Sequence, residues 1–445
     1  MHSRVITGVG VALVGAAVIA AGAGPAAADR GGPLEAVIVT SSGQPRPSGA
    51  ISLSGDGRYV VFISDADDLV PADTNNDYDV FVRDRWTGTN SRINLSSTGQ
   101  ETPAQGENAS NNGGGYISAD GRYVAFSSEA RDLVPDRTNG ARSIFVRDRW
   151  AGTTRLVSVS ADGTQIATDS REEQISGNGR YVVFSRLDRI GNGDESTVAD
   201  IVRYDLRTAT VRSIPTSTTW SWRDGHGPRP QISADGRYVA FASDAVLTPG
   251  DSNGVQDVFI HDFVSGFTRK VSRSHTGGQT SADSYPGAMS ADGRFVVFAS
   301  TDATLVRGDT NGQSDVFVYD LRTGSTRLIS VSSTGVQGDR MSYEWMTISG
   351  DGRYVGFGSA AGNLVPGDTN GQLDVFVHDR RTARTVRISE PNRGGESAGE
   401  SFSPGISADG RHVVFNSTSL LLAGGEDSGI HSYAYARPLT VRAAD

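Results

Sequence analysis

Short apolar runs recur at regular intervals along the chain. One of them, Arg294-Phe295-Val296-Val297-Phe298, directly follows the pair Asp292-Gly293. A run that is apolar at consecutive positions is typical of a strand covered on both faces. The Asp-Gly pair predicts a tight turn before it, because glycine readily adopts positive φ. The pair or its equivalent occurs about every 58 residues, at Asp56-Gly57, Asp120-Gly121, Asn178-Gly179, Asp235-Gly236, Asp292-Gly293, Asp351-Gly352 and Asp409-Gly410.

Each repeat contains four short segments rich in β-branched and aromatic residues. In one repeat they are residues 231–233, 237–243, 257–262 and 267–272. They are bounded by turn-forming residues, and no stretch has a sustained helical period. Four-stranded sheets that cover one another around an axis form a β-propeller. We therefore expect an all-β fold in which seven repeats give a seven-bladed β-propeller with four-stranded antiparallel blades.

The connections between strands predict two different faces. The Asp-Gly turn joins the first strand to the second, and a turn such as Thr323-Gly324 joins the third to the fourth. In an antiparallel meander these two turns lie on one face, here called the tight-turn face. The two longer connections share the opposite face, here called the long-loop face. We expect the working surface on the long-loop face, because functional residues concentrate on variable loops.

Two terminal segments compete to close the ring. Residues 34–40 resemble a fourth strand with no blade before it, and residues 439–442 could also supply a fourth strand. An N-terminal strand that completes the last blade would remove its open edge. We favour the N-terminal segment as the closing strand.

The N-terminus has the pattern of a secretory signal peptide. Arg4 precedes an apolar run over residues 5–21, and Ala26-Ala27-Ala28 offers a cleavage site of small residues. The alternative is a membrane anchor, for which an apolar run of this length is marginal. We predict a signal peptide over residues 1–28 and one propeller domain over residues 29–445. The mature protein would be secreted or in the cell envelope, with no membrane span and no disulfide framework, since the chain has no cysteine.

The charge balance argues against one class of partner. The chain has 41 basic and 51 acidic residues and a formal net charge of −10. A nucleic-acid-binding protein typically has a basic face. We therefore expect no nucleic-acid partner, whereas cations remain compatible with this charge.

The connection from the second to the third strand is acidic in four repeats. One example reads Gly308-Asp309-Thr310-Asn311-Gly312-Gln313-Ser314-Asp315. Several oxygens converging from one loop can bind Ca²⁺. The alternative is a capped turn, in which Asp and Asn side chains accept hydrogen bonds from nearby backbone N–H groups. The candidate ligands are Asp73, Asn75, Asp77, Asp79, Asp251, Asn253, Asp257, Asp309, Asn311, Asp315, Asp368, Asn370 and Asp374.

Aromatic residues gather in two of the long connections. These connections lead towards the first strand of a repeat, so we expect their residues near the central opening. Aromatic clusters there could stack on a sugar ring or anchor a protein. The alternative is that they fill the channel. The candidate ligand-binding residues are Trp220, Trp222, His226, Tyr343 and Trp345.

The repeats resemble a known family. The pattern Ser-x-Asp-Gly-Arg-Tyr-Val-x-Phe, followed by Asp-Val-Phe-Val-x-Asp, is similar to the TolB-type, WD-repeat-like β-propeller repeat. It covers nearly all of the predicted mature chain. The resemblance implies a propeller of the cell envelope or exterior that often binds proteins. One departure is that the family usually has proline before Asp-Gly, where this chain has alanine or glycine.

Two functions follow as hypotheses. The first is a secreted, monomeric, non-enzymatic propeller that binds a protein or glycan on its long-loop face, stiffened by calcium. The alternative is an exported hydrolase or lyase with its site at the mouth of the channel. No G-x-S-x-G nucleophile elbow is present, because the two matches, residues 250–254 and 395–399, lie in connections between strands and precede no helical pattern, and H-E-x-x-H is absent. We therefore favour the first. A polar cluster with mutual hydrogen bonds at the channel mouth would favour the enzyme.

Overall fold

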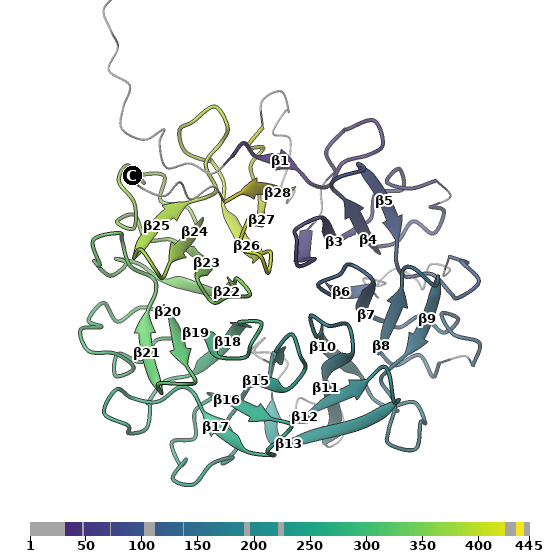
Figure 1. Ribbon diagram of the computed structural model, residues 1–445, viewed down its shortest axis with the longest axis horizontal. Helices are drawn as coiled ribbons and strands as arrows, with labels where there is room; N and C mark the ends of the chain where they lie inside the picture. Colours follow the sequence, from purple (N-terminus) through teal and green to yellow (C-terminus); the bar gives the residue numbers. More distant parts are fainter. Residues whose placement is uncertain are drawn as a thin grey trace, which may run out of the picture.

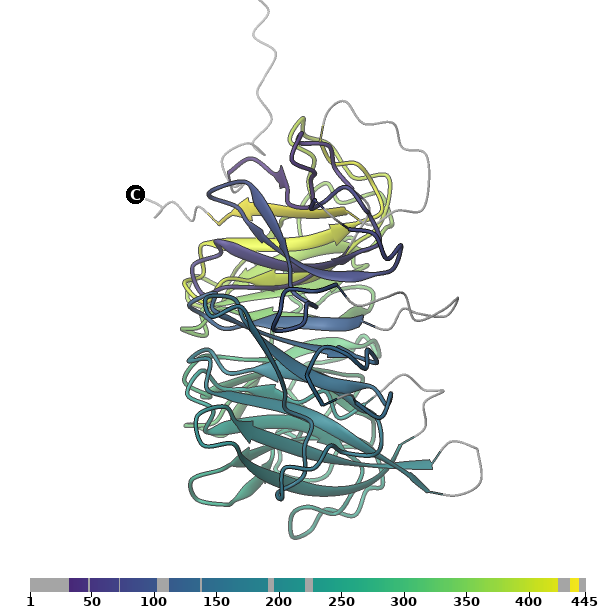
Figure 2. The same ribbon diagram turned by 90° about the vertical axis from the view of Figure 1, so that its right-hand side faces the viewer.

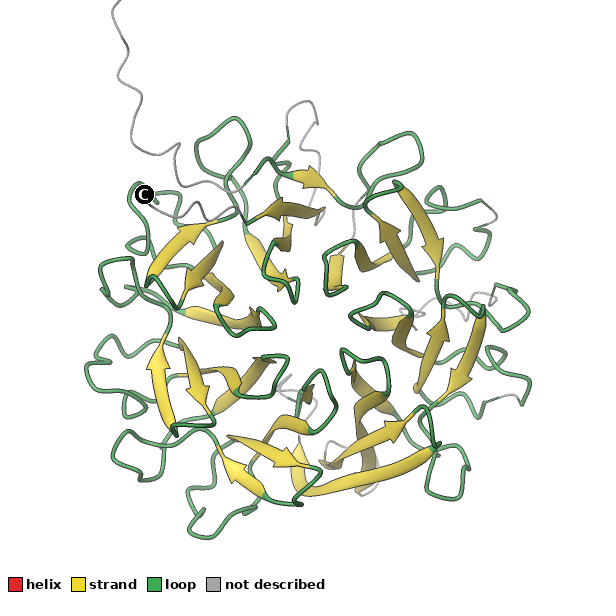
Figure 3. Ribbon diagram, viewed as in Figure 1, coloured by secondary structure: helices red, strands yellow, loops and turns green. Residues whose placement is uncertain are grey.

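The computed structural model describes residues 32–46, 49–71, 73–101, 112–136, 138–190, 196–220, 227–422 and 433–439. The predicted signal peptide lies outside these residues. Strands and loops make up the described chain (Figure 3). It contains no helix that is long and apolar enough to cross a membrane.

Six blades are each built from four consecutive strands, numbered here in chain order. The strands of blades 1 to 3 are β2 (Gly49–Leu53), β3 (Tyr59–Ser64), β4 (Asp79–Asp84), β5 (Thr89–Arg92), β6 (Asn112–Ile117), β7 (Tyr123–Ser128), β8 (Ser143–Asp148), β9 (Thr153–Leu156), β10 (Ser170–Ile175), β11 (Tyr181–Ile190), β12 (Ser196–Asp205) and β13 (Thr210–Trp220). Those of blades 4 to 6 are β14 (Gln231–Ile232), β15 (Tyr238–Ser243), β16 (Asp257–Asp262), β17 (Thr268–Lys270), β18 (Ser284–Met289), β19 (Phe295–Ser300), β20 (Asp315–Asp320), β21 (Ser325–Leu328), β22 (Ser342–Ile348), β23 (Tyr354–Ser359), β24 (Asp374–Asp379) and β25 (Arg384–Arg387).

The remaining sheet joins the two ends of the chain. It contains β26 (Ser401–Ile406), β27 (His412–Ser417) and β28 (Tyr433–Pro438), with β1 (Glu35–Ala36) as its outer strand. The expectation of seven blades from seven repeats is corrected accordingly. Six blades are continuous, and the seventh four-stranded sheet is a composite, because the last repeat supplies only three of its strands. Glu35 pairs with Ala436, which confirms that the N-terminal segment closes the ring.

The sheets surround a central opening, with the first strand of each innermost and the fourth outermost (Figure 1). Seen from the side, the strands run across the thickness of the ring (Figure 2). The second and third strands form the core. Phe298 and Phe317, both fully buried, stack across β19 and β20 with their ring centroids 5.5 Å apart.

Hydrogen bonds explain the repeated Ser-x-Asp-Gly-Arg motif. Ser290 Oγ donates to Asp292 Oδ1 at 2.6 Å and accepts from the N–H of Phe295 at 2.9 Å. Gly293 has φ 72°, which suits glycine. Arg294 then forms an ion pair with Asp320 at the end of the third strand, at 2.7 Å. The same ion pair joins the second and third strands in all six continuous blades.

Candidate functional site

The central channel holds a cavity of about 630 Å³. Its walls come from the innermost strand of each sheet and the residues next to that strand. At the tight-turn face the cavity ends on a ring of small residues, one before each Asp-Gly or Asn-Gly pair. These are Gly55, Ala119, Gly177, Ala234, Ala291, Gly350 and Ala408.

Bulges interrupt several innermost strands and alter what faces the channel. The register shifts between Arg171 and Gln174 in β10, and Glu172 inside this bulge has φ 57°. The residue at the same distance from the turn also has positive φ in blade 4 (Arg229, 45°) and in the composite sheet (Ser403, 51°). A left-handed backbone is unfavourable for residues other than glycine. Such local strain is common at functional sites.

Glu172 lies in the channel wall between blades 3 and 4. Its Oε2 accepts hydrogen bonds from Ser185 Oγ at 2.8 Å and from the backbone N–H of Arg229 at 3.0 Å. Burial raises the pKa of Glu172, and these two hydrogen bonds oppose the rise. Two hydrogen-bond donors therefore hold the Glu172 carboxylate in place. A polar cluster with mutual hydrogen bonds is the arrangement that an enzyme site in the channel would require.

Glu173 is turned towards blade 2 and is more deeply buried. Only 2% of its surface is exposed, and its Oε1 has no hydrogen-bond partner. Burial raises the pKa of Glu173 to about 7, although the charge of Arg142 and hydrogen bonds from Ser127 lower it. The side chain passes close to Gly114, where an added Cβ would lie 2.6 Å from Oε1. Glu173 is therefore a carboxyl group that holds its proton near neutral pH.

Aromatic rings gather on the wall formed by blade 6 and the composite sheet. Trp345 stacks on Tyr343, with centroids 6.4 Å apart and planes at 10°, and its ring lies 5.8 Å from that of Phe402. Half of the Trp345 surface is exposed, and Trp345 lines the channel cavity. We call Tyr343, Trp345 and Phe402 the aromatic wall. Of the three, Trp345 is the residue that lines the cavity.

The structure brings together two of the five predicted ligand-binding residues, Tyr343 and Trp345. Trp220 ends the outermost strand β13, opposite Thr197, so its backbone is on the periphery of blade 3 rather than at the channel. Trp222 and His226 lie outside the described residues. Sequence reasoning missed Glu172, Glu173, Arg229 and Phe402. For Glu172 and Arg229 the sequence did hold a signal. Both are charged residues at a fixed distance before the tight turn, at a position where other repeats have Gly114 or Pro286.

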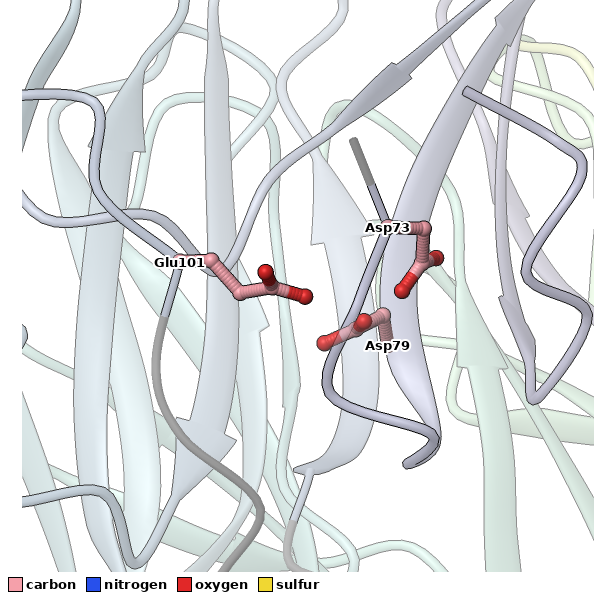
Figure 4. Close-up of side chains that lie close together, drawn as sticks. All are labelled: Asp73, Asp79 and Glu101. Atoms are coloured by element: carbon pink, nitrogen blue, oxygen red, sulfur yellow. The ribbon is translucent and has the colours of Figure 1, made fainter. Parts of the chain in front are cut away.

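In blade 1 the acidic loop forms a compact carboxylate group. One oxygen each of Asp73, Asp79 and Glu101 lie within 4.8 Å of one another, close enough to hold a metal ion (Figure 4). A buried side-chain cation contacts the same group. Arg92 lies 2.6 Å from Asp73, 2.5 Å from Glu101 and 3.3 Å from Asp79. Even so, burial raises the pKa of Asp79 to about 6.

The same arrangement recurs in blades 4 and 6. Lys270 Nζ lies 3.1 Å from Asp251 and 2.5 Å from Asp257. Arg387 contacts Asp368, Asp374 and Glu396 at 3.0, 3.4 and 3.2 Å. Arg92, Lys270 and Arg387 are each the last residue of the outermost strand, paired with the buried phenylalanine of the third strand. Their contacts with the acidic loops were not predicted from the sequence.

Blade 5 differs, because Leu328 takes the position of that cation. Its two carboxylates are bridged by an amide. Gln337 Nε2 donates to Asp309 Oδ1 at 2.7 Å and to Asp315 Oδ2 at 2.8 Å. Asp315 is fully buried, and burial raises its pKa. Blade 5 therefore keeps two acids without the ion pair found in blades 1, 4 and 6.

The asparagines of these loops act as turn caps. Asn311 Oδ1 accepts from the backbone N–H of Gln313 at 2.8 Å, and its Nδ2 donates to Asp315 at 2.9 Å. Asn253 and Asn370 donate to the equivalent aspartates, Asp257 and Asp374. Asn75 and Asp77 accept backbone N–H groups in the same way. Capping thus accounts for the loop geometry, and calcium binding stays a prediction.

No protein-family model matches the chain, and no curated protein matches it. Solved structures do match. An oligogalacturonate lyase in complex with manganese is 13% identical with a TM-score of 0.53, and the match covers 93% of this chain and 99% of that one. The β-propeller domain of the Trilobed protease from Pyrococcus furiosus, which has an open velcro topology, is 12% identical with a TM-score of 0.50 and covers 89% and 98%.

TolB proteins are among the matching structures. TolB from Acinetobacter baumannii is 14% identical with a TM-score of 0.39, and the match covers 89% of this chain and 81% of that one. Likeness at these identities concerns the fold alone, and the TolB score is too low to support more. Membership of the TolB family therefore stays a prediction. By its fold, the chain is a β-propeller.

Proposed function

We propose that this protein binds a neutral oligosaccharide in its central channel, with the aromatic wall as the stacking platform. The observation that carries the proposal is Trp345, half exposed between two other rings on the wall of a 630 Å³ cavity. Aromatic faces stack well on sugar rings, whose C–H edges are apolar. The cavity volume also falls within the range of small-molecule sites.

The polar side of the channel supports a neutral sugar over an acidic one. Glu172 and Arg229 lie beside Gln174 and Gln231 in the lining, and these groups can exchange hydrogen bonds with hydroxyls. Two of the lining side chains, Glu172 and Glu173, are carboxyl groups, and the whole chain has a net charge of −10. A uronate would meet the like charge of the Glu172 carboxylate, while Glu173 holds its proton near neutral pH. The oligogalacturonate after which the matching lyase is named is therefore a poor fit for these residues.

Calorimetric titration with neutral oligosaccharides and with oligogalacturonate tests this proposal. We expect Trp345→Ala to weaken binding of the neutral ligand by about tenfold, the loss of one stacked ring. Trp86→Ala is the matched control, because Trp86 is 68% exposed but belongs to the tight turn after β4. Equal losses in the two variants, or tighter binding of the uronate, would contradict the proposal.

A second candidate function is cleavage of the bound glycan as a hydrolase or lyase. Glu173 supports it, because a buried carboxyl group with a pKa of about 7 can donate a proton at neutral pH. Release of reducing ends should then be lost in Glu173→Gln while ligand binding remains. Binding without any product over long incubation would reject the enzyme and keep the binding protein.

We also propose that, of the four acidic loops, the one in blade 5 takes a calcium ion. This loop lacks the ion pair that Arg92, Lys270 and Arg387 make in the other three. Asp309 and Asp315 would be its side-chain ligands, and carboxylate oxygens suit Ca²⁺.

We further propose that the mature chain works outside the cytoplasm as a monomer and begins near Asp29. The pattern of residues 1–28 supports export. N-terminal sequencing of the protein recovered from medium or periplasm tests it, and a retained N-terminus in a membrane fraction would contradict it. Light scattering of the same sample measures the oligomeric state.

A further inference from the structure

A second cavity, of about 310 Å³, lies between blades 5 and 6 beside the tight turns. Arg294, Arg327 and Arg380 line it, and Asp320 is the one acid among the lining residues. Thr323 and Ser325 line it too, and their hydroxyls are 2.7 Å apart. Three guanidinium groups against one carboxylate make this a locally basic site on a chain whose net charge is −10.

Two of the three arginines are held in place by the fold. Arg294 forms the ion pair with Asp320 that all continuous blades share, at 2.7 Å. Its guanidinium carbon lies 4.5 Å from the centroid of Phe295, and that of Arg380 lies 4.0 Å from the same centroid. Arg380 donates to the backbone oxygen of Gly352, but its buried Nε has no hydrogen-bond partner. Both guanidinium groups therefore lie against the same ring.

The repeats show what is unusual about Arg327. The arginines at the equivalent position of the outermost strand, Arg155, Arg212 and Arg269, each donate to a backbone oxygen of the next blade. The residues that supply those oxygens are Leu206, Phe263 and Leu321. At the junction of blades 5 and 6, Arg380 takes the position of these three residues. Within the described residues, the Arg327 guanidinium donates no hydrogen bond to Arg380.

The junction therefore places two arginines where the junctions of blades 2 and 3, 3 and 4, and 4 and 5 pair an arginine with an apolar residue. Burial lowers the pKa of Arg380, and the charge of Arg327 lowers it further. The charges of Asp320, which is already paired with Arg294, and of Asp351 oppose this lowering, and the charge of Arg294 adds to it. An anion between Arg327 and Arg380 would remove this repulsion.

We propose that this cavity binds a tetrahedral oxyanion, a phosphate or sulfate group. Guanidinium groups recognise such groups through paired N–H donors, and hydroxyls such as those of Thr323 and Ser325 complete the set. The anion would be a free ion or an ester on a larger molecule. This site is separate from the channel and does not depend on the function proposed there.

Titration calorimetry with inorganic phosphate and with sulfate, in low-salt buffer, tests the proposal. Wild-type protein should bind one ion. Arg327→Gln and Arg380→Leu should each weaken binding by about tenfold. Leucine occurs naturally at the position of Arg380 in blades 3 and 5, as Leu206 and Leu321, so this variant suits the fold. Arg269→Gln, the same change in blade 4, is the matched control and should bind as wild type does.

A sugar phosphate used as a third probe separates the two sources of the group. Tighter binding than inorganic phosphate indicates an ester on a larger molecule, and equal binding indicates the free ion; both support the site. No binding to the wild type would overturn the proposal, and so would an equal loss in Arg269→Gln and Arg327→Gln.

Discussion

The backbone N–H of Asp409 donates a hydrogen bond to the carbonyl oxygen of Gly55, at 3.0 Å, and joins the last repeat to the first. It is one of seven hydrogen bonds that link the residues before the Asp-Gly and Asn-Gly pairs around the channel. The others are Gly55 to Ala119, Ala119 to Gly177, Asn178 to Ala234, Ala234 to Ala291, Ala291 to Gly350 and Gly350 to Ala408. This belt closes the ring independently of the two-residue strand β1.

The belt explains why proline is missing from five of these turns, in which the residue before the Asp-Gly pair is itself the donor. The N–H of Ala291 donates to Gly350 at 3.0 Å, and proline has no N–H. Space is also short, since a Cβ on Gly350 would lie 2.8 Å from the carbonyl oxygen of Ala408. The departure from the TolB-type motif is thus a consequence of direct backbone contact between neighbouring blades.

Proline substitution tests the belt. Ala291→Pro should lower the free energy of unfolding by about 1–3 kcal/mol, because it leaves the oxygen of Gly350 without its donor. Ala408→Pro is the matched control: it has the same preceding serine, but Ala408 N–H is not a donor in the belt, where Asp409 donates instead. Chemical denaturation measures both. Equal destabilisation would mean that proline acts through local strain and not through the lost hydrogen bond.

The sequence was sufficient to predict the strands and the closing segment but not the partners of the acidic loops. Ser290, Asp292 and Gly293 act within one turn, so their pattern is local and repeats visibly. Arg387 reaches Asp368 from the outermost strand, and that contact depends on how the two strands fold together. Trp220 lies at the end of the outermost strand rather than near the channel, because β12 and β13 extend over 10 and 11 residues.

Removal of the buried cation in blade 6 should be strongly destabilising. Arg387→Leu places there the residue found in blade 5 and leaves Asp368, Asp374 and Glu396 without their ion pair. An uncompensated buried charge costs about 3–5 kcal/mol. Denaturant unfolding measures the loss, with Arg393→Leu, an exposed arginine of the same blade, as the control. A loss below 1 kcal/mol, roughly that of a surface ion pair, would contradict a structural role for Arg387.

Blade 5 offers the reciprocal change. Leu328→Arg supplies the cation that blades 1 and 6 have, so the variant should be more stable than wild type in EDTA. Millimolar calcium should raise the unfolding temperature of the wild type, since a ligand at one hundred times its Kd contributes about 2.7 kcal/mol. The variant should show no such rise, because its guanidinium would occupy the ion's place. An unchanged wild type would leave the loops as capped turns, and a calcium response retained in Leu328→Arg would move the site to another loop.

Glu173 should make stability depend on pH in a defined direction. Its pKa is about 7 in the folded protein, against an ordinary value of 4.5, so the folded state retains a proton that the unfolded chain releases. Its contribution is therefore fully present below pH 4.5 and is lost as the pH rises through 7. Glu173→Gln cannot ionise. Between pH 4.5 and pH 8 its free energy of unfolding should therefore rise relative to that of wild type by on the order of 3 kcal/mol. Unfolding curves across this range measure the difference, with Glu400→Gln as the exposed control. If Glu173→Gln and wild type lose stability in parallel, Glu173 is ionised in the folded protein, and the proton donor required by the enzymatic candidate is absent.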